Sequence, residues 1–150
     1  MADDTVQPES LAHANWLPRW EVYALGIGDM LALIVFAAVG RASHGVEDIG
    51  PVLGTLNTAL PFIVGWVIAG AATGHYRGLA LYPIGRVILR TVLTGLVATP
   101  LAIGLRAFAL DELPPLSFVL VAGLSSTVLV LLWRIFWSRL RLWWWRELPG

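Results

Sequence analysis

Four long apolar runs fill most of this chain of 150 residues and constrain its fold more than any other feature. They cover about 22–40, 53–72, 87–107 and 115–137. A helix needs about 20 residues to cross the hydrocarbon core of a bilayer, so each run is long enough for one span. Only 13% of the residues are charged, about half the fraction that is usual in a soluble domain. The sequence therefore predicts an all-α integral membrane bundle of four transmembrane helices.

The rest of the chain divides into short tails around this bundle. Residues 1–15 are acidic and polar, and we interpret them as a flexible cytoplasmic tail. The transmembrane domain is expected over 16–140, and a Trp- and Arg-rich cytoplasmic tail over 141–150. The N-terminus lacks the basic region of a signal peptide, so the first run is expected to remain as a mature helix.

The distribution of arginine predicts the orientation. With four spans, both tails and the second loop fall on one side of the membrane. That side holds eight of the ten basic residues, and the other side holds only Arg41 and Arg106. Because an excess of arginine marks the cytoplasmic side, we expect both termini in the cytoplasm.

Asp29 is the intramembrane residue that most needs a physical reason. It lies about two turns into the first span, where a carboxylate costs about 2.5–3.5 kcal/mol on insertion scales. Arg90 enters the third span and Arg134 leaves the fourth span on the same side, so either could pair with it. Three interpretations stay open: a structural ion pair that holds the helices together, a carboxylate that handles protons or ions, and a carboxyl group hydrated near the interface.

Polar side chains at the external ends of the spans form a second set of candidates. Arg41, Ser43 and His44 follow the first span. A solvated helix cap is our main interpretation of His44, with a proton or ligand site as the alternative. Asn57, in the second span, is expected to hydrogen-bond to a neighbouring helix, with a ligand contact as the alternative. Arg106 ends the third span on the same side.

Tryptophan gathers where the chain is expected to meet the membrane surface. Indole rings favour the headgroup layer, and arginines interleaved with them bind lipid headgroups. We therefore expect interfacial anchors and no nucleic-acid partner. The expected anchors are Trp16, Trp20, Trp133, Trp137, Trp143, Trp144 and Trp145.

The sequence indicates no cofactor, no metal and no catalytic residue. Haem held between spans would need His residues that face each other inside the bilayer. His13 is in the tail, His44 in the external loop and His75 in the cytoplasmic loop, outside the predicted spans. There is no Cys, and neither a Gly-rich phosphate loop nor a Ser-His-Asp arrangement is evident.

Small residues recur at intervals of four in the second and third spans, as in Gly65 with Ala69 and Ala98 with Ala102. Such spacing lets helices approach closely. It predicts a tight bundle and leaves open whether the contacts are within one chain or between chains.

Several short motifs are similar to those of a known family. They are Gly28-Asp29, Phe36, Gly40-Arg41, Ser43-His44, Pro61-Phe62 and Gly65-Trp66. On these residues the chain resembles a prokaryotic family of small membrane proteins catalogued as domain of unknown function 3054, over about 22–137. The resemblance implies a four-helix protein of the prokaryotic cytoplasmic membrane and brings no known activity. It marks Asp29, Arg41 and His44 as motif positions without giving any of them a role.

Three classes of function remain. We favour a structural or accessory subunit that packs against the lipid bilayer and against a second copy or a larger membrane complex, because the chain is small and has few polar groups. The alternative is a small oligomeric transporter or channel, with Asp29, Asn57, Thr99 and Arg106 lining a path. An intramembrane enzyme would need reactive groups clustered at one depth. The sequence indicates no such cluster, so we expect no enzyme.

Overall fold

The computed structural model describes residues 19–45, 49–77 and 83–146, and this part of the chain contains four helices. They are α2 (Arg19–His44), α3 (Pro51–Thr73), α4 (Ile84–Leu110) and α5 (Leu116–Arg146). Each helix is long and apolar enough to cross a membrane. The predicted all-α architecture with four spans is therefore confirmed.

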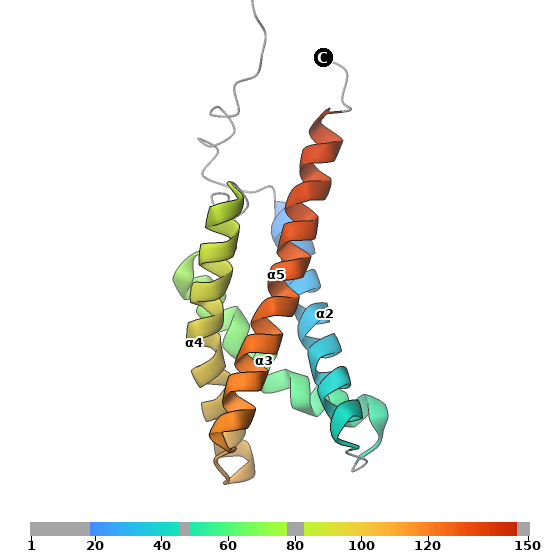
Figure 1. Ribbon diagram of the computed structural model, residues 1–150, viewed down its shortest axis with the longest axis vertical. Coiled ribbons are helices and arrows are strands. Elements are labelled where there is room, and N and C mark those ends of the chain that lie inside the picture. The colour runs from blue at the N-terminus through green and yellow to red at the C-terminus, as the bar shows by residue number, and fades with distance from the viewer. Residues whose placement is uncertain (1–18, 46–48, 78–82, 147–150) are drawn as a thin grey trace, which may run out of the picture.

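The helices form a ring in which each one packs against two others (Figure 1). Consecutive helices are neighbours, and α5 returns to pack against α2, which closes the ring. In the figure, α3 crosses the bundle obliquely behind the other helices, from the foot of α2 towards α4. The end of the bundle where α2 and α4 begin carries the exposed side chains of Arg77, Arg86 and Arg139. We call it the basic end, and the other end the opposite end.

Close contact between α3 and α4 depends on small residues. Gly65 is buried, and a Cβ atom added to it would lie 2.9 Å from the carbonyl oxygen of Ala98 and 3.0 Å from the backbone nitrogen of Ala102. Ala69 and Ala102 are also fully buried. The four-residue spacing of small side chains therefore serves a contact within the chain, where two backbones approach closely.

The contact between α4 and α5 uses glycine and threonine reciprocally. The side chain of Thr127 on α5 occupies the space beside Gly95 on α4, and Thr99 on α4 occupies the space beside Gly123 on α5. Thr99 also donates its hydroxyl to the Gly95 carbonyl at 2.8 Å. A hydroxyl in lipid needs such an acceptor, and its own helix supplies one here.

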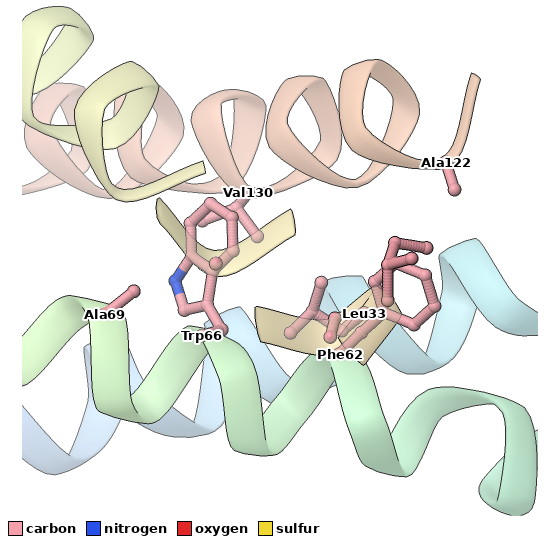
Figure 2. Close-up of a cluster of buried hydrophobic side chains, with 9 residues drawn as sticks. Leu33, Phe62, Trp66, Ala69, Ala122 and Val130 are labelled. Carbon is pink, nitrogen blue, oxygen red and sulfur yellow. The ribbon is translucent and has the colours of Figure 1, made fainter. Parts of the chain in front are cut away.

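The apolar core lies between α3 and the three helices α2, α4 and α5 (Figure 2). Trp66 points from α3 towards Val130 of α5, and Phe62 lies beside Leu33 of α2. Phe36 adds an edge-on contact to Phe62, with ring centroids 5.0 Å apart. Outside this core, large apolar side chains cover the outer faces of all four helices. Exposed apolar faces on helices of this length imply a lipid bilayer around the bundle.

The helices extend beyond the apolar runs at both ends of the bundle. α2 continues to His44, so Ser43 and His44 lie in its last turn, exposed, and the Ser43 hydroxyl donates to the Gly40 carbonyl at 2.8 Å. α5 continues through residues 141–146, so the expected boundary at 140 falls inside a helix. The expected tail at 1–15 lies outside the described residues, as do residues 147–150.

Replacing Gly65 with Val is expected to lower the free energy of unfolding by about 1–3 kcal/mol, because the added atoms would overlap the backbone of α4. The matched control is Gly104→Ala on α4, where an added Cβ atom meets nothing within 4 Å. The control should leave stability unchanged or raise it by up to about 1 kcal/mol. Thermal unfolding in one detergent compares the two, and a Gly65→Val protein as stable as the parent would contradict the packing described here.

Candidate functional site

Asp29 and Arg134 form a bidentate ion pair in the interior of the bundle. Arg134 Nε donates to Asp29 Oδ1 at 2.9 Å, and Arg134 Nη2 donates to Asp29 Oδ2. Each side chain is only 1% exposed. Two parallel charge-assisted bonds are the strongest arrangement that a guanidinium and a carboxylate can make. The pair joins α2 to α5 and so closes the ring of helices.

His75 lies against this ion pair. Gly74, the residue after α3, has a left-handed φ of 69° that glycine adopts without a Cβ penalty. The His75 N–H donates to the Gly70 carbonyl at 2.9 Å, the bond that defines a Schellman turn. The turn places His75 Nε2 at 3.6 Å from Asp29 Oδ2, and Arg134 Nη1 donates to the His75 carbonyl at 3.2 Å. We call Asp29, His75 and Arg134 the charge cluster.

Aromatic rings enclose the charge cluster. The His75 ring centroid lies 5.8 Å from that of Trp66 and 5.4 Å from that of Tyr76. The Arg134 guanidinium lies 5.2 Å from the centre of the Tyr76 ring, within the range of a cation–π contact. His75 lies in the loop after the second span, as the sequence indicated, but its side chain is only 1% exposed and packs inside the bundle.

The environment keeps His75 neutral. Burial lowers the pKa of the His75 imidazole below its ordinary value of 6.5, and Asp29 opposes this only in part. The guanidinium groups of Arg134 and Arg90 lower the His75 pKa further. Burial also raises the pKa of the Tyr76 phenol well above its ordinary value. At pH 7 the charge cluster therefore consists of one cation, one anion and a neutral imidazole.

Arg90, the other sequence candidate for pairing with Asp29, has a different role. Its Nη1 donates to the carbonyl oxygens of Thr73 at 2.8 Å and Gly74 at 3.1 Å. These carbonyls end α3 and have no partner within that helix, so a cation there is favourable. The hydroxyls of Thr73 and Thr94 lie 2.7 Å apart beside them. Arg90 thus holds the turn that carries His75.

A second ion pair joins the same two helices nearer the basic end. Arg141 Nε lies 3.1 Å from Glu21 Oε1, and the Glu21 side chain is only 4% exposed. Sequence reasoning missed this pair, although a signal was present. Residues spaced by four along α2 lie on one helix face, and the buried residues of that face are Glu21, Leu25, Asp29, Leu33 and Ala37.

Gly28, directly before Asp29, makes room for α5. The Trp133 indole occupies the space that a side chain at Gly28 would need. Trp133 and Trp137 are both half-buried between α2 and α5, and the Trp137 ring lies 6.3 Å from that of Trp20 in an edge-on contact. Trp133 and Trp137 therefore contribute to packing. Because Gly28 has no side chain, α5 lies close enough to α2 for Arg134 to bind the neighbouring Asp29.

The remaining expected anchors are described only in part. Trp20 is 55% exposed and Trp143 is 53% exposed, and for both the role of interfacial anchor stays a prediction. Trp144 and Trp145 lie in the last turns of α5. Trp16 lies outside the described residues.

The external-side candidates do not gather at the charge cluster. The Arg41 guanidinium packs against the backbone of α3 at the opposite end. Asn57 is exposed on the outside of the bundle, and Thr99 is half-buried between α4 and α5. The Arg106 guanidinium lies 5.5 Å from the centre of the Phe118 ring. Asn57 faces outward while Asp29 faces inward, so the four residues considered for a path do not form one track.

Fold and site define a class: the chain is a multi-pass membrane protein with four candidate spans and a buried polar cluster. The family model described as "Protein of unknown function (DUF3054)" matches residues 26–137, so the chain belongs to this family. No curated protein and no solved structure matches the chain.

Replacing Arg134 with Lys is expected to lower the free energy of unfolding by about 1–3 kcal/mol, because an ammonium group cannot make the paired bonds to Asp29 and also reach the His75 carbonyl. Arg139→Lys is the matched control, since Arg139 is exposed on the same helix. Chemical or thermal unfolding in detergent measures both variants. Equal stability of the two would contradict a structural role for the bidentate geometry.

Proposed function

We propose that this protein is a structural or accessory subunit of a membrane assembly and that it catalyses no reaction. One observation carries the proposal: the only aspartate within the described spans is buried in direct contact with an arginine. A carboxylate kept for transport or catalysis needs access to substrate or water. The Asp29 carboxylate has both oxygens bonded by Arg134 and is 1% exposed.

The position of the ion pair supports a role in fixing the shape of the bundle. Asp29 and Arg134 come from the first and last of the described helices, α2 and α5, which meet only because the bundle closes. Breaking a buried pair leaves an uncompensated charge, which costs about 3–5 kcal/mol. The pair therefore favours one arrangement of α2 against α5 over alternatives that would separate the two charges.

The alternative, a small transporter or channel, has less support. It requires polar groups that line one path. Asn57 lies on the outer surface, Thr99 bonds to its own helix and Arg106 packs on an aromatic ring. Because these residues are separate from Asp29, a structural role is favoured over a transport path.

The proposed partners are the lipid bilayer and, at its apolar outer faces, a second copy of the chain or a larger membrane complex. We place the protein in a prokaryotic cytoplasmic membrane with both termini in the cytoplasm. The support is the gathering of Arg77, Arg86 and Arg139 at the basic end, the side that the positive-inside rule assigns to the cytoplasm.

A double-mutant cycle tests the scaffold. Asp29→Asn and Arg134→Gln should each lower the free energy of unfolding by about 3–5 kcal/mol. The double variant should cost less than the two losses added together, because neither charge is then left alone. If Asp29→Asn were as stable as the parent and instead abolished a proton-dependent phenotype in cells, the structural proposal would be wrong.

Cysteine labelling tests the orientation, since the chain has no cysteine of its own. Glu112→Cys lies in the exposed turn between α4 and α5, and Arg77→Cys lies exposed at the basic end. A membrane-impermeant maleimide added to intact cells should label Glu112→Cys and leave Arg77→Cys unlabelled. Both should react after permeabilisation, and the reverse pattern would place the termini outside.

A further inference from the structure

His75 presents a buried basic group that the scaffold itself does not require. Its side chain is 1% exposed, and neither ring nitrogen has a hydrogen-bond partner among the residues that the structure describes. Nε2 lies 3.6 Å from Asp29 Oδ2, just beyond hydrogen-bonding distance. An apolar side chain could fill the space between the Trp66 and Tyr76 rings without leaving polar atoms unpaired. The imidazole adds one property that such a side chain lacks, which is the ability to take up a proton near neutral pH.

We propose that His75 is a proton-binding site coupled to the Asp29–Arg134 ion pair, so that acidification at the basic end weakens the junction between α2, α3 and α5. The proposal rests on the proposed function, because it describes how the ion pair of the scaffold is regulated. The site lies in the turn after α3, beyond the last residue of that candidate span. A proton that enters from the basic end therefore need not cross the apolar core.

The charges around His75 determine what its protonation does. Asp29 faces it from α2, Arg134 from α5 and Arg90 from α4, and the phenol of Tyr76 follows it in the chain. With the imidazole neutral, Asp29 and Arg134 balance each other. Once protonated, the imidazolium would compete with Arg134 for the same carboxylate oxygen, Oδ2. Two cations would then share one anion in a site with almost no solvent, which leaves one charge uncompensated.

Arg134 transmits the change to the backbone. The same guanidinium that binds Asp29 also donates to the His75 carbonyl at 3.2 Å. A shift of Arg134 away from the imidazolium therefore loosens its bonds to α2 and to the turn after α3 together. The consequence is a bundle that is tight at neutral pH and looser in acid.

The sign of the pH dependence follows from the lowered pKa of His75. Well above pH 6.5, the ordinary pKa, the imidazole is neutral in both the folded and the unfolded chain. As the pH falls below that value, the unfolded chain takes up the proton while the folded chain does not. The part of the free energy of unfolding that depends on neutral His75 is therefore fully present well above pH 6.5. It is lost as the pH falls from that value through the folded-state pKa of His75.

The test compares the melting temperature of the full-length protein in one detergent at about pH 8 and about pH 5. The parent should melt at least about 3 °C lower in acid. His75→Phe, which keeps an aromatic ring between Trp66 and Tyr76 and cannot bind a proton, should lose most of that difference. The matched control is His44→Gln, since His44 is exposed at the opposite end, and it should keep the difference.

A spectroscopic measurement keeps the test decisive if His75→Phe does not fold. NMR of the 15N-labelled imidazole, in a His13→Gln and His44→Gln background, should show His75 remaining neutral below pH 6.5 and should show the Arg134 side-chain signals shifting when it titrates. An ordinary titration with no change at Arg134 would overturn the proposal. So would a pH difference that persists in His75→Phe. Either result would leave the proposed structural function standing as long as Asp29→Asn is less stable than the parent. The two proposals can therefore fail independently.

Discussion

The fully buried ion pair between Asp29 and Arg134 joins α2 to α5, the contact that closes the bundle. A lone carboxylate within a span is costly, and a lone guanidinium is equally so. One lies on α2 and the other on α5, the first and last of the described helices, and the ring of four helices brings them into contact. Neither charge has a comparable partner on its own helix. Because the surroundings of a membrane helix are apolar, the two charges are stabilised only in a topology that makes α2 and α5 neighbours.

The short distances of this pair require close helix packing, and small residues provide it. Gly28 admits the Trp133 indole one residue before Asp29, and Gly65 lets α3 approach the backbone of α4. Several positions on which the family resemblance rests are these same contact residues, together with Trp66 and Phe62 of the core. The simplest physical explanation of the motifs is therefore packing around a buried charge, in agreement with the proposed scaffold.

Much of the fold could be predicted, and the charge cluster only in part. The apolar runs predicted four spans because helix length and hydrophobicity are local properties. Asp29 was recognisable because a carboxylate stands out in an apolar run, and Arg134 was one of two possible partners for it. His75 could not be recognised in this way, since it follows the second run and has the polar neighbours of a loop residue. Its inward position depends on the Schellman turn at Gly74 and on Arg90 holding that turn. The pair of Glu21 and Arg141 was accessible in principle, because Glu21 shares the four-residue spacing of the buried face of α2.

By itself the sequence determined the number of spans, the all-α class, the family and the residues that cannot face lipid alone. The family follows from short motifs, and the other three follow from composition and from periodicity along a single helix, which do not depend on neighbouring elements. Only the tertiary structure decided that Arg134 binds Asp29 while Arg90 caps α3, and that His75 completes the cluster. The reason is geometric: two arginines of equal charge at similar depth differ only in the rotation and crossing of their helices, and those follow from the packing of all four helices together.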